Sequence, residues 1–201
     1  MTIYCVARNY ALHAKELGNK LPSEPVIFIK ADTSLRAFEQ SEIAYPHETF
    51  HYEGEIVLRI GQNTETGSSP NLDIIDSFAL GIDLTRREKQ TELKKKGLPW
   101  TVSKSFLGSA IIGDFKPKQL FKNPESISFQ LFINKTLKQD GNLKNMIFPL
   151  KTILETLLES APLKKGDLIF TGTPEGVGEI GKGDEFEMIF PEINFRQKGK
   201  L

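Results

Sequence analysis

Short apolar runs separated by polar turns dominate the hydrophobic pattern of this chain. Runs with the length and composition of strands cover residues 3–7, 26–30, 53–60, 74–82, 110–115, 128–134, 168–170 and 185–190. Apolar residues at helical spacing, with stop signals after them, predict helices over 10–17, 85–96 and 146–158. Because these helices do not alternate regularly with the strands, the pattern predicts a strand-dominated α+β fold, not a doubly wound sheet.

The segments between these elements are polar or rich in glycine. Residues 31–50 have the composition of a long loop with short strands, and residues 172–183 that of a glycine-rich loop. No internal repeat, low-complexity tract or linker divides the chain, so residues 1–201 are expected to form a single domain. A chain of this length can bury a substantial core without disulfide bonds.

Charge and composition exclude several classes of protein. Lys and Arg together number 26, as do Asp and Glu, and this balance argues against nucleic-acid binding. The one basic cluster, Lys94 to Lys96, is typical of the solvated end of a helix. No apolar stretch approaches the roughly 18 residues of a membrane span, and the N-terminus lacks a secretory signal pattern. A single cysteine, Cys5, cannot form an internal disulfide, so nothing in the sequence demands an oxidising compartment. We therefore expect a cytoplasmic protein.

Three acidic residues form the most informative candidate site. Glu53 and Glu55 are two residues apart in a strand-like run, so their side chains point to the same face. Taken alone, this pair is explained better by a solvated edge strand with two surface glutamates. Asp83 changes the balance, because it follows another apolar run, where a charge needs a partner. A hard divalent cation with oxygen ligands compensates all three, which favours Mg²⁺ or Mn²⁺, with Ca²⁺ able to take the same ligands. Zinc is disfavoured because no predicted helix carries two of the three histidines at a zinc-ligand spacing; His47 and His51 are four apart but lie outside the predicted helices.

Further residues have side chains suited to binding or proton transfer. Arg87 and Gln90 are three apart in a predicted helix and could present a guanidinium fork to a substrate carboxylate. His13 and Glu16 have the same spacing, which suits an imidazole base oriented by a carboxylate. Lys104, among aromatic and small residues, could stabilise an oxyanion. Ordinary surface positions remain the alternative for each of these groups.

The glycine-rich loop imitates two nucleotide-binding motifs without meeting their requirements. Gly176 to Gly181 matches the letters of a dinucleotide fingerprint, but turn residues and a strand follow it instead of a helix. Gly183 occupies the position where a phosphate loop needs Ser or Thr. The turn from Thr171 to Pro174 is of more interest, because small hydroxyl residues and free amides can contact a carboxylate.

Several segments, taken in order, resemble the fumarylacetoacetate hydrolase family, especially its short acylpyruvase and oxaloacetate-decarboxylase-like members. The matching segments are Arg8 to Glu16, His51 to Glu55, Gly81 to Thr85, Lys95 to Thr101, Lys104 to Phe106 and Gly166 to Gly178. Two stretches depart from the common pattern: Arg86-Arg87-Glu88, where the family often has Ala-Arg-Asp, and Leu107-Gly108-Ser109. The C-terminal run from Pro191 to Leu201 also matches poorly.

The resemblance implies a fold, a set of ligands and a chemistry. It implies a mixed β-sandwich roll, usually in a homodimer, with a short N-terminal lid helix. It places Mg²⁺ or Mn²⁺ on Glu53, Glu55 and Asp83. The remaining assignments it implies are a water-activating pair, His13 and Glu16, and substrate contacts from Lys104, Arg87, Gln90 and Thr173.

The implied substrate is a small 2-oxo acid. The leading expectation is hydrolysis of an acylpyruvate to pyruvate and a carboxylic acid, which can extend to decarboxylation of oxaloacetate. Tautomerisation of a 2-oxo acid uses the same enol, so one site supports several reactions. Two alternatives stay open: an isomerase or decarboxylase of 2-hydroxyhepta-2,4-diene-1,7-dioate type, and a non-catalytic metal-binding protein on the same fold.

Overall fold

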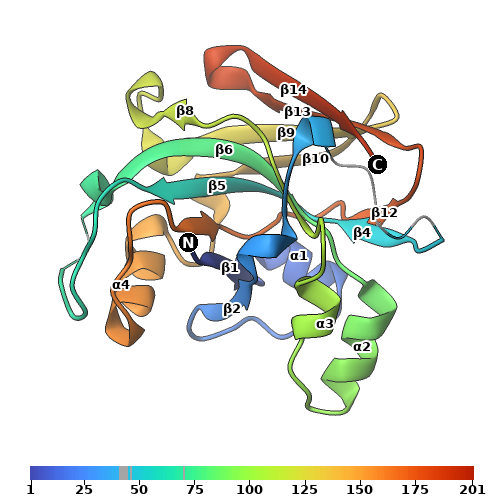
Figure 1. Cartoon of the computed structure of the whole chain (residues 1–201), viewed down its shortest axis with the longest axis horizontal. Helices are drawn as coiled ribbons and strands as arrows, with labels where there is room; N and C mark the ends of the chain where they lie inside the picture. The colour runs from blue at the N-terminus through green and yellow to red at the C-terminus, as the bar shows by residue number, and fades with distance from the viewer. Residues whose placement is uncertain (41–44, 46, 70) are drawn as a thin grey trace.

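A curled, mixed β-sheet forms the centre of the molecule (Figure 1). The computed structural model describes residues 1–40, 45, 47–69 and 71–201, so part of the predicted 31–50 loop lies outside the described residues. Within the described residues, the large sheet has eight strands. In spatial order these are β2 (Val26–Lys30), β1 (Ile3–Ala7), β11 (Leu168–Phe170), β5 (Gly54–Ile60), β6 (Ile75–Asp83), β7 (Ala110–Ile112) and β3 (Leu35–Ala37), with β8 (Lys116–Pro117) beside β6.

The alternation predicted along β5 is present and divides the core in two. Ile56, Leu58 and Ile60 pack into the larger apolar cluster, between the two sheets, whereas Val57 packs into a smaller cluster with residues of β1 and β11. Because side chains alternate along a strand, Glu55 falls on the same face as Val57. That face holds the candidate site.

A second, antiparallel sheet covers the other face of β5 and β6 (Figure 1). Its strands, in spatial order, are β10 (Thr136–Asn142), β9 (Ser128–Ile133), β13 (Glu185–Phe190) and β14 (Phe195–Lys200). A short pair, β4 (Phe50–Tyr52) and β12 (Gly178–Ile180), leads into the start of β5. Strands thus dominate, the two sheets pack as a sandwich, and the predicted α+β class is confirmed.

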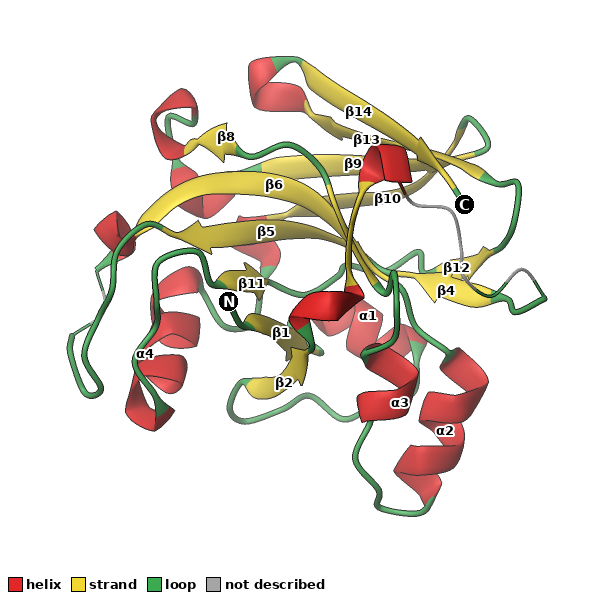
Figure 2. Cartoon of the chain, in the orientation of Figure 1, coloured by secondary structure: helices red, strands yellow, loops and turns green. Residues whose placement is uncertain are grey.

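The described residues contain four α-helices, which lie beside the large sheet (Figure 2). They are α1 (Ala11–Glu16), α2 (Arg87–Lys95), α3 (Thr101–Lys104) and α4 (Leu150–Ser160). Figure 2 shows α2 and α3 at the end of the sheet where β6 finishes and β5 begins, while α4 lies toward the opposite end. In the described part of the chain, no helix is long and apolar enough to cross a membrane.

The structure departs from the predicted elements where local pattern is weak. The helix predicted from residue 146 begins at Leu150, because Pro149 serves as its N-cap and prolines disfavour helical conformation in the residue before them. Strands β10 and β14 were not predicted, since their exposed, polar residues lie at the two edges of the second sheet. The glycine-rich loop contains β12, and the short helix α3 was also missed.

Candidate active site

Glu53, Glu55 and Asp83 come together at the end of the β5–β6 pair. Glu53 immediately precedes β5, Glu55 lies within it, and the amide of Asp83 donates a 2.9 Å hydrogen bond to the carbonyl of Glu53. Each residue offers a carboxylate oxygen, and these oxygens lie within 4.8 Å of one another. All three side chains are buried, with at most 6 % of each residue exposed. The sequence-predicted triad is therefore one compact cluster.

This cluster has the donor set that a hard divalent cation takes. Burial, followed by the charges of Asp83 and Glu53, raises the pKa of Glu55 well above its ordinary value. Three carboxylates held this closely repel one another, and Mg²⁺ or Mn²⁺ would relieve that repulsion through oxygen ligands. The residues present therefore fit the ion that the sequence predicted, with Glu53, Glu55 and Asp83 as its candidate ligands.

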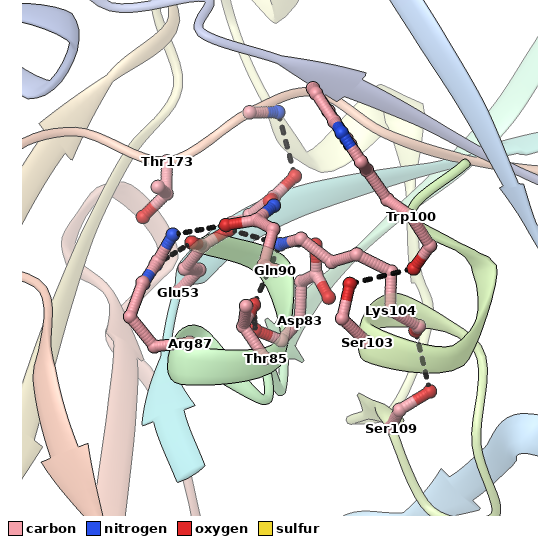
Figure 3. Close-up of polar contacts among 12 residues, drawn as sticks. Glu53, Asp83, Thr85, Arg87, Gln90, Trp100, Ser103, Lys104, Ser109 and Thr173 are labelled. Carbon is pink, nitrogen blue, oxygen red and sulfur yellow. Dashed lines mark hydrogen bonds and ion pairs between the residues drawn. The ribbon is translucent and has the colours of Figure 1, made fainter. Parts of the chain in front are cut away.

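Lys104 reaches into the same cluster from the end of α3 (Figure 3). Its Nζ donates to Oε2 of Glu53 at 2.7 Å, to Oδ2 of Asp83 at 2.7 Å and to the hydroxyl of Thr85 at 2.6 Å. Burial alone would lower the pKa of Lys104, but Asp83 and Glu53 outweigh it and hold the pKa above its ordinary value. Lys104 is thus a buried ammonium beside the carboxylates, where the sequence placed it as an oxyanion stabiliser.

A second buried lysine, which the sequence analysis missed, lies on the other side of Asp83. Nζ of Lys30 is 2.7 Å from Oδ1 of Asp83, and its side chain is completely buried. Lys30 also donates to the carbonyls of Lys104 and, at 3.0 Å, Ser109. Its only sequence signal is a lysine that ends the apolar run of β2. By these contacts Lys30 fixes Asp83 and the chain around Lys104 relative to each other.

Arg87 and Gln90 share one face of α2, as their spacing predicted. Nη1 of Arg87 donates to Oε1 of Gln90 at 2.7 Å, and Nη2 pairs with Oε1 of Glu53 (Figure 3). Burial would raise the pKa of Glu53, but Lys104 and Arg87 outweigh it and hold that pKa well below its usual range. These cations therefore stabilise the ionised form of Glu53, whereas burial and the neighbouring carboxylates disfavour the charge of Glu55.

His13 and Glu16 contact each other from α1. Nδ1 of His13 is 3.4 Å from Oε2 of Glu16, and His13 is buried with 4 % exposed. Burial lowers the pKa of His13, while Glu53 and Glu16 oppose that shift. With Glu16 accepting at Nδ1, the other ring nitrogen of neutral His13 is free to act as a base. The predicted pairing is present, and the catalytic role of the pair stays a prediction.

Thr173 lies above Arg87 and Glu53, and its neighbour Gln139 was not predicted (Figure 3). Gln139 is buried in β10, with 1 % exposed. Its Nε2 donates to the hydroxyl of Thr173 at 2.8 Å, and its Oε1 accepts from the amide of Gly54 at 2.8 Å. Since Gly54 separates the two glutamates, one amide group braces both the carboxylate strand and the glycine-rich loop. Its position in a polar edge strand gave no sequence signal.

The turn from Thr171 to Pro174 touches a protein carboxylate. The amide of Gly172 donates to Oε2 of Glu55 at 2.6 Å. Gly172 has φ +101°, and a Cβ there would lie 2.7 Å from the Cβ of Asn9, so this close approach requires glycine. Asn9 is fully buried, donates to the carbonyl of Thr171 at 2.9 Å and accepts from the amide of Phe148 at 2.8 Å. These bonds hold the start of α1 against the carboxylate cluster.

The cavity beside these groups is also lined by Arg8, Lys94 and Trp100. Lys94 therefore departs from the prediction of a solvated helix end, although Lys95 and Lys96 are exposed as expected. Burial and the nearby charges of Arg8 and Arg87 lower the pKa of Lys94 to about 8. The outer part of the cavity thus has a surplus of positive charge.

The chain is similar to known proteins along nearly its whole length. Residues 2–198 match the family model described as fumarylacetoacetate (FAA) hydrolase C-terminal. The chain is 40 % identical over 188 residues to the mitochondrial oxaloacetate tautomerase of Mus musculus, covering 92 % of this chain and 85 % of that protein. It is 37 % identical over 184 residues to the mitochondrial oxaloacetate decarboxylase of Dictyostelium discoideum, covering 90 % and 84 %. The fumarylpyruvate hydrolase from Pseudomonas aeruginosa, solved in complex with Mn²⁺ and pyruvate, matches with a TM-score of 0.88 at 30 % identity, covering 100 % of this chain and 88 % of that chain.

Proposed function

Since the chain belongs to the fumarylacetoacetate hydrolase family, we propose that it is a divalent-metal-dependent enzyme that interconverts the keto and enol forms of oxaloacetate. The observation that carries the proposal is the buried triad of Glu53, Glu55 and Asp83 with the Lys104 ammonium 2.7 Å from two of its members. This arrangement suits a reaction that develops negative charge on a 2-oxo oxygen. The tautomerase relative supports the choice of substrate and reaction.

The metal site and the side chains have separate roles in this proposal. Mg²⁺ or Mn²⁺ held by Glu53, Glu55 and Asp83 would supply Lewis-acid stabilisation of the developing enolate. Arg87 and the hydroxyl of Thr173 orient the substrate carboxylate by charge-assisted hydrogen bonds. Neutral His13, oriented by Glu16, takes the proton from C3, and Lys104 stabilises the enolate oxygen until that oxygen is protonated. Return of a proton to C3 regenerates the keto form.

The test follows the loss of enol absorbance from enolic oxaloacetate, with and without Mg²⁺ or Mn²⁺ after chelation. We expect metal-dependent catalysis above the background of metal alone, and a loss of at least about 100-fold in kcat for Lys104→Met. Lys122→Met, at an exposed lysine, is the matched control. A chelated enzyme that retained full activity, or a Lys104→Met variant that kept wild-type kcat, would overturn the proposal.

A second candidate reaction is hydrolysis of an acylpyruvate, which the His13–Glu16 contact favours. Hydrolysis needs a base for the attacking water, and the fumarylpyruvate hydrolase relative shares the fold of this chain. Pyruvate release from acetylpyruvate measures it directly. His13→Ala should abolish this release, whereas decarboxylation of oxaloacetate, which needs no attacking water, should continue. If His13→Ala lost hydrolysis and decarboxylation equally, a role of His13 specific to water activation would be contradicted.

Two expectations about the protein in its cell remain proposals. A homodimer follows from family resemblance, and sedimentation velocity of the purified chain would test it. A cytoplasmic location was expected from the sequence, while the names of the Mus musculus and Dictyostelium discoideum relatives say mitochondrial. Imaging of the tagged full-length protein would decide between the two compartments.

A further inference from the structure

Two basic side chains meet one aromatic ring at the outer part of the cavity. Cζ of Arg8 lies 5.7 Å from the centre of the Trp100 ring, and Nζ of Lys94 lies 5.1 Å from the same centre. The three residues come from different segments: the turn after β1, the helix α2 and the residue that begins α3. All three line the cavity that contains the carboxylate triad. In Figure 3, Trp100 lies on the side of the cluster where Lys104 enters, away from Arg87.

The charges of these two side chains are not matched by protein carboxylates. None of the ion pairs found among the described residues includes Arg8 or Lys94, and the buried Nε of Arg8 makes no hydrogen bond there. Burial is the main cause of the lowered pKa of Lys94; the charges of Arg8, Arg87 and Lys104 lower it further, while Glu53 opposes them. A ligand carboxylate at this position would relieve the repulsion.

The inner cations of the site, by contrast, are already paired. Lys104 contacts Glu53 and Asp83, and Arg87 contacts Glu53. Lys30 contacts Asp83 on its other side. With a divalent cation bound as well, the inner cluster needs no further anion beyond the head of the substrate. The charges of Arg8 and Lys94 are therefore available to bind a part of the ligand other than its 2-oxo acid head.

The backbone holds Arg8 firmly. Arg8 has φ +58°, a left-handed conformation that is uncommon for residues other than glycine. The adjacent Asn9 is fully buried and bonded to Thr171 and Phe148, which keeps the chain in this conformation. Strain of this kind persists only where surrounding contacts enforce it, and it is often found at ligand sites. The backbone from which the Arg8 side chain extends is thus fixed independently of the contact with Trp100.

We propose that Arg8 and Lys94, packed against Trp100, form a subsite for the distal carboxylate of a short 2-oxo dicarboxylic acid. The inference rests on the proposed function, because it takes the 2-oxo carboxylate head to lie at the triad with Lys104 and Arg87. An arginine fork and an ammonium are the groups that bind a carboxylate most strongly, and the indole ring excludes water from one side. The enzyme therefore selects diacids over monoacids of similar length.

The competing explanation is that both cations only pack on Trp100. Cation–π contacts of this kind stabilise a folded protein, and their loss would lower the melting temperature without changing ligand choice. The two explanations differ in one observable, which is the ratio of affinities for a diacid and a monoacid.

Binding to the Mn²⁺-loaded protein tests the inference without relying on turnover. Dissociation constants for 2-oxoglutarate, a diacid, and 2-oxobutyrate, a monoacid, would be measured by titration calorimetry for wild type, Lys94→Met, Arg8→Gln and Arg8→Lys. We expect each neutral variant to weaken diacid binding about 10- to 100-fold while monoacid binding changes less than about twofold. Arg8→Lys, which keeps the charge but loses the fork, should fall between wild type and Arg8→Gln.

Lys95→Met is the matched control, because it removes the same charge from the neighbouring, exposed position of α2. It should leave both dissociation constants unchanged. Variants that weaken both acids equally, or neither, would overturn the subsite while leaving the proposed function intact. Failure of the proposed function has a different signature: wild-type protein that binds 2-oxo acids but shows no turnover of oxaloacetate.

Discussion

Nε2 of Gln139 donates a 2.8 Å hydrogen bond to the hydroxyl oxygen of Thr173, and the backbone dictates the direction of that bond. Oε1 of the same amide accepts from the N–H of Gly54, and Nε2 also donates to the carbonyl of Pro174 at 2.9 Å. A backbone N–H can only donate and a carbonyl can only accept, so the amide cannot be turned round. Thr173 must therefore accept from Gln139, which leaves its own hydrogen available to the cavity.

Gln139→Glu should reverse this polarity. At neutral pH a glutamate accepts from Gly54 and from the Thr173 hydroxyl, so the hydroxyl hydrogen turns away from the substrate carboxylate. We expect KM for the 2-oxo acid to rise about tenfold, the size of one lost hydrogen bond to a charged group. Gln119→Glu, at an exposed position, is the control. Steady-state kinetics and melting curves would be compared, and a variant that lost only stability would contradict the assigned polarity.

Glu55→Gln should separate metal affinity from stability. Burial, followed by the charges of Asp83 and Glu53, raises the pKa of Glu55, so a neutral amide removes a buried charge and its repulsion in the metal-free protein. We expect a higher melting temperature after chelation, together with at least about a tenfold loss of Mn²⁺ affinity. Calorimetric titration and thermal unfolding measure the two quantities, with exposed Glu65→Gln as control. Lower stability of chelated Glu55→Gln would show that the repulsion is compensated by other groups.

Gly172→Ala should destabilise the fold and disturb the cavity. Its positive φ and the 2.7 Å approach of a new Cβ to Asn9 act together, and we expect a loss of about 2–4 kcal/mol in the free energy of unfolding. Gly166→Ala provides the comparison, because Gly166 has φ +91° but open space around it. That variant should lose only about 1 kcal/mol, the cost of the backbone conformation alone. Urea unfolding would measure both, and equal losses would mean that the contact with Asn9 costs nothing.

The pH dependence of acylpyruvate hydrolysis should report His13. A base works in its neutral form, and burial lowers the pKa of His13, so activity should persist below pH 6.5, the ordinary histidine value. Glu16 opposes that shift, which means that Glu16→Gln should move the acid limb of kcat/KM to still lower pH. Profiles of both proteins from pH 4 to 9 would be recorded. A limb that moved upward in Glu16→Gln would exclude His13 as the titrating base.

Local spacing allowed part of the site to be predicted. Glu53 and Glu55 are two residues apart on a strand, and His13 with Glu16 and Arg87 with Gln90 are three apart on helices. Both members of each pair belong to one local run of the chain, so the period of a strand or helix is enough to predict that their side chains share a face. The cluster with Asp83 needed a further step, which family resemblance supplied.

Other parts of the site depend on contacts between distant segments. Gln139 meets Gly54 only through the packing of β10 against β5, and Lys30 meets Asp83 across strands that are not neighbours in the sheet. Lys94 has the same local sequence surroundings as exposed Lys95, and only the position of α2 beside Trp100 distinguishes them. Polar residues at such positions carry no periodic signal, because their burial is set by which other segment covers them.

The order in which the chain is synthesised gives the paired strands β5 and β6 a particular consequence. All three carboxylates and Lys104 lie between residues 53 and 104, and β5 pairs directly with β6. The groups that hold α1 over them, Thr171 and Gly176, are synthesised much later than Lys104, as is β11, which pairs with β1. The charged groups of the pocket are therefore all synthesised before the residues that fasten its cover. The contacts of the α1 region with Thr171 and Gly176 can form only once that later segment has been made, so the cover of the pocket is fastened after its charged groups are already in the chain.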